Sequence, residues 1–148
     1  MKIIIETTNE DGCNFDQKKL KSIAKETIFS SGLKQIFSKD IVIGLGVVSP
    51  KKISELNKKY RHKDSPTDIL SFSNYEDQKE LLEEKGSKLF LGDLIICPED
   101  IENYAKKENI SVETELMEVF SHGVLHLLGF SHGDLMFGIQ EEVAKNQK

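Results

Sequence analysis

Three of the four histidines in this chain fall within eleven residues, in the segment HGVLHLLGFSH. His122 and His126 are four residues apart, which places both imidazoles on one face of a helix, about 6 Å apart along its axis. Gly129 has no Cβ and can adopt the left-handed conformation that ends a helix, so the chain can turn and bring His132 to the same point. Three imidazole nitrogens at this spacing predict a zinc site.

The number of histidines indicates what such a zinc ion would do. Three protein ligands leave the fourth tetrahedral position open, which is typical of catalytic sites, whereas structural sites usually have four protein ligands. Two alternatives remain. One is a structural zinc with His62 or Cys97 as fourth ligand, and the other is three histidines that share no ion.

The histidine spacing, with a glycine seven residues after the first histidine, also matches the metzincin protease signature. In those proteases the residue after the first histidine is a glutamate that acts as general base. Gly123 occupies that position here, which argues against a protease mechanism.

A second feature is a run of positive charge between residues 51 and 63. Within this run Glu55 is the single acid. The cations are Lys51, Lys52, Lys58, Lys59, Arg61 and Lys63. The net charge of −5 argues against a nucleic-acid partner, but the charges are unevenly spread. The run therefore predicts either a phosphate-facing patch or an ordinary solvated helix face.

Hydrophobic periodicity predicts the elements that position these residues. Strands are expected at 2–7, 41–48, 67–72 and 90–97, and helices at 16–31, 50–60, 98–107, 111–128 and 134–145. Residues 73–88 are polar and unpatterned, so they are expected to form a mobile loop. The fold class is therefore α/β or α+β, with a small mixed sheet, and residues 1–148 are expected to form one domain.

Several acidic residues need an explanation. Asp64 and Asp68 flank a proline turn and are expected to cap backbone amides there. Asp93 lies inside a strand, where it would either orient a ligand histidine or another site group, or form a buried hydrogen bond. Glu113 and Glu115 lie in the first turn of the metal-site helix, where negative charge is favourable. The glycines within 41–48 predict a close neighbour or ligand on one side of that strand.

Cys13 and Cys97 form no CxxC pair and are expected to be free thiols in a reducing compartment. No stretch approaches the roughly 20 apolar residues that a membrane span needs. The protein is therefore expected in the cytoplasm, without a membrane partner.

Three segments, LNKKYRHKDSPTDILSF, LGDLIICPEDI and HGVLHLLGFSH, together resemble the YbeY family of bacterial ribosomal-RNA maturation factors. Their order and spacing also match, so the resemblance extends from about Ile43 to His132. Ser131 stands where the family commonly has aspartate. The resemblance implies a compact zincin-like α/β domain.

The resemblance also implies an activity: a zinc-dependent endoribonuclease specific for single-stranded RNA. Such an enzyme matures the 3′ end of small-subunit ribosomal RNA and takes part in ribosome quality control. Its partners would be pre-rRNA and a ribosomal subunit or ribosomal proteins. By position, His122, His126 and His132 would bind zinc, and Arg61 and His122 would belong to the catalytic centre.

On this basis Lys58, Lys59 and Lys63 are expected to contact the RNA backbone. The attacking group would be a metal-bound water or the RNA's own 2′-hydroxyl. The alternative is a non-catalytic ribosome-assembly factor with a structural metal site, which the missing glutamate at position 123 favours.

Overall fold

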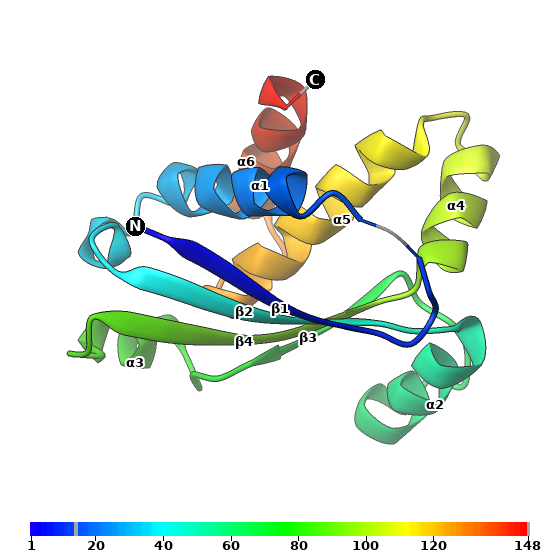
Figure 1. The fold of residues 1–148 in the computed structure, drawn as a ribbon, viewed down its shortest axis with the longest axis horizontal. Coiled ribbons are helices and arrows are strands. Elements are labelled where there is room, and N and C mark those ends of the chain that lie inside the picture. The colour runs from blue at the N-terminus through cyan, green and yellow to red at the C-terminus, as the bar shows by residue number, and fades with distance from the viewer. Residues whose placement is uncertain (14, 148) are drawn as a thin grey trace.

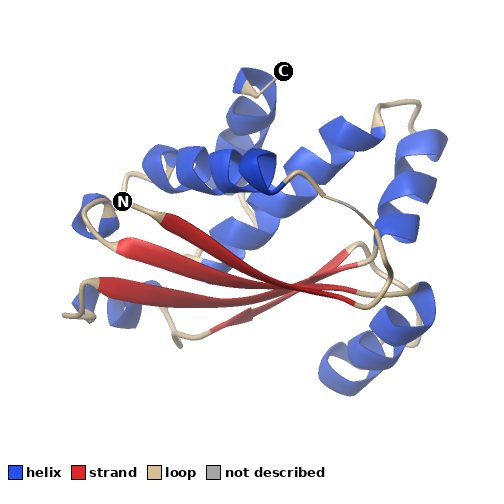
Figure 2. Ribbon diagram, in the orientation of Figure 1, coloured by secondary structure: helices blue, strands red, loops and turns tan. Residues whose placement is uncertain are grey.

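A four-stranded mixed sheet forms the centre of the computed structural model, which describes residues 1–13 and 15–147 (Figures 1 and 2). Its strands are β1 (Ile3–Asn9), β2 (Asp40–Val47), β3 (Ile69–Ser73) and β4 (Lys88–Ile96). They are arranged in the order β1-β2-β4-β3. β1, β2 and β4 pair in parallel, and β3 runs antiparallel to β4 at the edge of the sheet.

The helices are distributed unequally over the two faces of the sheet. α1 (Gln17–Ser30), α5 (Val112–Leu127) and α6 (Asp134–Asn146) pack together over one face (Figure 1). α2 (Pro50–Arg61) packs on the other face, where Ile53 belongs to a small apolar cluster with Leu70 of β3 and Leu56 packs against that cluster. α4 (Pro98–Lys107) contacts α5, and a 3₁₀ turn spans Lys34–Ile36.

The predicted strands and long helices are all present, with boundaries within two residues of those expected from sequence. The capping residues explain this agreement. The Ser49 hydroxyl accepts from the Lys52 amide at the start of α2, and the Ser111 hydroxyl accepts from the Thr114 amide at the start of α5.

The prediction of a mobile loop at 73–88 was wrong, because this segment contains α3 (Gln78–Glu83). The Asp77 side chain caps this helix, and Leu81 is fully buried in the core. One buried leucine in a polar stretch gives no helical periodicity, so the pattern could not show the helix. The segment also supports the metal-site helix. The Ser73 hydroxyl donates to the Leu127 carbonyl (3.2 Å), and the Gln78 amide donates to the Leu128 carbonyl (3.1 Å).

Both suggestions for Asp93 were also wrong: it neither orients a ligand histidine or another site group nor forms a buried hydrogen bond. Leu94 packs toward α5, so its neighbour Asp93 points to the opposite face of the sheet, where it is exposed. There Asp93 lies directly against Gly44 of β2, in the space that a Cβ would fill. The expectation of a close neighbour beside the β2 glycines is confirmed.

Cys13 and Cys97 are free thiols, as expected. Among the helices of the described residues, none combines the length and the apolar character needed to span a bilayer.

Gly123 lies where α5 packs most closely against the sheet. A Cβ added at this position would lie 2.6 Å from Ile69 Cδ1 and 2.9 Å from Leu94 Cδ2. Both distances are shorter than side-chain contacts allow, so the helix reaches the sheet because this residue has no side chain. A glutamate in the position of the protease base would have to enter the packed core.

We expect Gly123→Ala to destabilise the protein by about 1–3 kcal/mol through overpacking. Gly138→Ala is the matched control, because it lies within α6 with nothing near its missing Cβ. That change should stabilise the protein by about 0.5–1 kcal/mol, because alanine has a higher helix propensity than glycine. Urea unfolding measures both variants, and equal effects would show that α5 is not closely packed at Gly123.

Candidate metal centre and cleft

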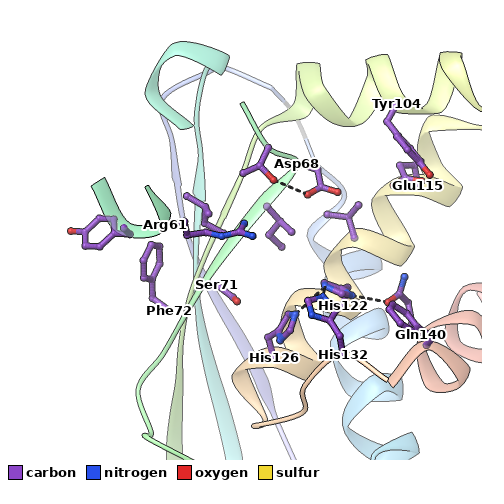
Figure 3. Close-up of a pocket in the computed structure, with 16 residues that line it drawn as sticks. Arg61, Asp68, Ser71, Phe72, Tyr104, Glu115, His122, His126, His132 and Gln140 are labelled. Carbon is purple, nitrogen blue, oxygen red and sulfur yellow. Dashed lines mark hydrogen bonds between the residues drawn. The ribbon is translucent and has the colours of Figure 1, made fainter. Parts of the chain in front are cut away.

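Three histidine side chains converge at one end of an open cleft of about 810 Å³ (Figure 3). His122 and His126 project from the last two turns of α5, and His132 returns from the loop that follows. Gly129 makes this return possible: its φ is +89°, and a Cβ there would lie 2.9–3.0 Å from Gln78. Neither His62 nor Cys97 belongs to the cluster of potential ligands found among the described residues.

The distances between the imidazole nitrogens fit one metal ion. His122 Nε2 lies 3.0 Å from His126 Nε2 and 3.2 Å from His132 Nε2. Tetrahedral ligands at the usual zinc–nitrogen distance of 2.0–2.1 Å are separated by about 3.3–3.4 Å. The cluster therefore has nearly the size that a shared zinc ion requires.

Hydrogen bonds at the other ring nitrogens indicate which tautomers are present. His122 Nδ1 lies 2.9 Å from Gln140 Oε1, and His126 Nδ1 lies 3.1 Å from the Phe130 carbonyl oxygen. Both oxygens are acceptors, so each Nδ1 carries the proton and each Nε2 presents a lone pair. Two lone pairs 3.0 Å apart repel each other unless a cation lies between them, so the donor set fits a metal ion.

Burial keeps these two imidazoles neutral. It lowers the pKa of His122, and the neighbouring His132 acts in the same direction while the Gln140 hydrogen bond opposes it. Burial also lowers the pKa of His126, reinforced by His122, His132 and Arg61. Neutral imidazole is the form that binds metals, so the site is prepared for an ion at neutral pH.

Arg61 lies across the cleft from the histidines. It is the last residue of α2, its side chain lines the cleft, and Figure 3 shows it directed toward the centre. α2 ends here because His62 adopts a left-handed conformation, with φ of 59°. A guanidinium beside the three imidazoles could bind an anionic oxygen held at the same point.

The three predicted substrate-binding lysines lie outside the cleft lining. Lys58, Lys59 and Lys63 are exposed near the carboxyl end of α2. Lys58 Nζ is 3.9 Å from Asp64, and Lys59 Nζ is 5.1 Å from the centre of the Tyr60 ring. The structure therefore brings Arg61 to the histidines and leaves the lysines on the adjoining surface.

Two carboxyl groups also line the cleft. Asp68 accepts from the Thr67 hydroxyl (3.4 Å), whereas the sequence suggested that it caps a backbone amide. Glu115 is buried, and the sequence had given it only the favourable place of an acid in the first turn of α5. One signal for Glu115 was present in the sequence: it precedes His122 by seven residues, which places both on the same face of a helix.

Gln140 is a further residue that sequence reasoning missed. It lies on α6, and it fixes the ring of His122 through the Nδ1 hydrogen bond. Phe137, from the same helix, lies 6.0 Å from the ring of His132 and 6.3 Å from that of His122, measured between ring centres. Neither contact follows from local spacing, because both depend on how α6 packs after the turn at Gly129.

Fold and site together define a mixed α/β protein with a candidate metal site of three histidines at the end of a core helix. The family model described as "Endoribonuclease YbeY" matches residues 4–147, so the chain belongs to the YbeY family. The resemblance noted in the sequence is thereby confirmed over nearly the whole chain.

Individual relatives agree with this assignment. A protein named endoribonuclease YbeY from Buchnera aphidicola is 37% identical over 112 residues, which cover 76% of this chain and 69% of that protein. A protein of the same name from Picosynechococcus is 46% identical over 83 residues, covering 56% of this chain and 51% of the relative. The chain thus matches between half and about two thirds of the length of these relatives.

The fold also resembles a solved structure. The solution structure of TM1509 from Thermotoga maritima aligns with a TM-score of 0.58 and 28% sequence identity. The alignment covers 98% of this chain and 88% of that protein.

We expect Gln140→Ala to weaken metal binding by about 10- to 100-fold, because the loss of a hydrogen bond behind a ligand histidine frees its ring. Glu141→Ala changes the exposed neighbour on the same helix and should leave the affinity unchanged. Competition against a chromophoric chelator measures both. Equal affinities in the two variants would show that Gln140 does not orient His122.

Proposed function

We propose that residues 1–148 act as one zinc-dependent endoribonuclease domain that cleaves single-stranded RNA. The observation that carries this proposal is the convergence of three Nε2 atoms, with those of His126 and His132 lying 3.0 and 3.2 Å from that of His122, and with Arg61 across the cleft. The family and the names of its relatives support RNA as the substrate. His122, His126 and His132 would hold the zinc.

The chain's own residues define most of the chemistry. When bound, zinc supplies Lewis-acid polarisation of a phosphoryl oxygen and activation of water near neutral pH. Arg61 offers a planar fork of donors to a phosphate and stabilises the extra negative charge of the transition state. Lys58, Lys59 and Lys63 attract the backbone of a single strand toward the cleft from the adjoining surface.

The attacking group is either a water or the 2′-hydroxyl of the RNA, and the products distinguish them. Attack by the 2′-hydroxyl leaves a 2′,3′-cyclic phosphate, whereas attack by water leaves a linear phosphate directly. Gly123 provides no general base beside His122, so a base would come from the RNA, from solvent or from elsewhere in the cleft.

The biological substrate proposed from the family is pre-rRNA in the cytoplasm. The enzyme would mature the 3′ end of small-subunit ribosomal RNA and act in ribosome quality control, with a ribosomal subunit or ribosomal proteins as partners. Depletion of the protein should lead to accumulation of small-subunit rRNA with an extended 3′ end, which mapping of RNA termini measures.

A second candidate function is a non-catalytic ribosome-assembly factor with a structural metal. Gly123 favours it, because the glutamate base of related metal sites is absent. The open fourth position beside Arg61 favours an enzyme. Tight RNA binding by the wild type without any metal-dependent cleavage would support the assembly factor.

Arg61→Lys separates transition-state stabilisation from simple attraction. It keeps the positive charge but loses the bidentate fork, so cleavage should fall by roughly ten- to a thousandfold. RNA affinity should fall far less, because the surrounding lysines still attract the backbone. Single-turnover cleavage and affinity at two salt concentrations measure the two effects. Lys21→Arg, on the exposed surface of α1 and outside the cleft lining, is the control that should change neither.

Equal losses of cleavage and affinity in Arg61→Lys would show that Arg61 is an ordinary phosphate contact. The zinc content of both variants should match that of the wild type, since neither residue is a metal ligand.

A further inference from the structure

Glu115 lines the cleft as a carboxyl group whose hydrogen bonds the protein does not complete. The residue is 6% exposed, and within the described residues its Oε2 atom is buried without a hydrogen-bond partner. An unsatisfied buried carboxyl oxygen is costly, so natural proteins retain one mainly where something else supplies the donor. Oε2 is closed off from the cleft, so a donor group that enters the cleft would bind to Oε1, the other oxygen of this carboxyl group.

The position of Glu115 argues against a direct part in bond cleavage. It lies seven residues before His122 on α5, so about 10 Å of helix separates the two residues. That distance is too long for proton transfer at the metal centre and is suited to contact with a neighbouring part of a bound RNA strand. Figure 3 shows Glu115 at the end of the cleft away from the histidines, beside Tyr104.

The charge around Glu115 indicates which part of the RNA can bind there. Burial, together with the nearby acids Glu118, Asp68 and Glu108, raises the pKa of Glu115 to about 7. This end of the cleft is therefore acidic and repels phosphate, whereas Arg61 marks the end that attracts it. A strand that crosses the cleft would place phosphate near Arg61 and a base near Glu115.

Tyr104 supplies an aromatic surface at the same end. Its side chain lines the cleft, the residue is 48% exposed, and the negative charges of Glu108 and then Glu115 raise its pKa. Bases of single-stranded RNA stack on exposed aromatic rings, while polar groups beside the ring contact the base edge. Tyr104 and Glu115 together have both of these properties.

We propose that Glu115 is a specificity-determining residue that accepts a hydrogen bond from the exocyclic amino group of an RNA base stacked near Tyr104. The inference rests on the proposed function, since it assumes that single-stranded RNA enters this cleft. A carboxyl group accepts well from the amino group of cytosine, and adenine and guanine also carry one. Uracil has a carbonyl oxygen in the corresponding position, so it is disfavoured.

Cytosine and uracil provide the matched comparison, because they have the same ring size and differ mainly at this edge. The experiment uses zinc-loaded protein with fluorescent eight-nucleotide oligocytidylate and oligouridylate. Affinity is measured by anisotropy in the cold, with intact RNA verified on gels, and cleavage is measured as kcat/KM. At pH 8, above the pKa of Glu115, the carboxylate can only accept, and the wild type should favour cytosine by roughly tenfold or more, the size of one hydrogen bond to a charged group.

Glu115→Gln should reduce this preference to within about twofold, since an amide can present either a donor or an acceptor to the base. Glu118→Gln is the matched control: it removes the same charge one turn further along α5, outside the cleft lining, and should keep the preference. The variant at 115 should fold normally, because the charge it removes is disfavoured in the folded protein. Unchanged zinc content and circular dichroism verify this.

The outcomes separate the two proposals. Equal affinity of the wild type for both oligonucleotides, or an unchanged preference in Glu115→Gln, would overturn the role of Glu115. A cytosine preference in binding that Glu115→Gln removes, without cleavage of either RNA by the wild type, would support this subsite and contradict the proposed endoribonuclease activity.

Discussion

Repulsion between imidazole lone pairs is the constraint on which the rest of this structure depends. His122 and His126 present their Nε2 atoms to each other at 3.0 Å while both Nδ1 atoms are engaged by oxygen acceptors. Such an arrangement has to be enforced by the surrounding fold, and several elements do so. Gln140 holds one ring from α6, and the Phe130 carbonyl oxygen holds another from the loop after α5.

The same helix explains both what the site contains and what it lacks. α5 approaches the sheet closely because Gly123 has no side chain, and this contact turns His122 and His126 toward the cleft. The close approach leaves no room for a glutamate at position 123. The absence of the protease base is thus a consequence of packing, and the site takes its polarity instead from Arg61 and from the acidic end of the cleft around Glu115.

Local spacing was sufficient to predict part of this arrangement. The i, i+4 pair His122 and His126, the turn at Gly129 and the serine caps of α2 and α5 are all encoded within a few residues, and these features are present as expected. Gln140 could not be predicted, because its contact depends on how α6 packs against α5. α3 could not be predicted because Leu81 is its one buried residue, and a single buried residue in a polar segment gives no periodic pattern.

Side chains alternate between the two faces along a regular strand, and this rule could have predicted the face on which Asp93 lies. The register of β4 against β2 shifts near Gly92, however, so the sequence did not show which face Asp93 occupies. The sequence analysis explained Glu115 by its place in the first turn of α5. That explanation considers the electrostatics of an isolated helix and does not predict burial against other elements. Its burial in the cleft arises from α4 and the residues around Asp68, which only the tertiary structure brings together.

The central claim is that three imidazoles hold one zinc ion with its fourth position open to solvent or substrate. X-ray absorption spectroscopy at the zinc edge of the loaded protein tests it most directly. Three histidine nitrogens at about 2.0–2.1 Å and one oxygen ligand are the expected result. A sulfur ligand, a fourth protein nitrogen, or fewer than three histidines around the ion would contradict it.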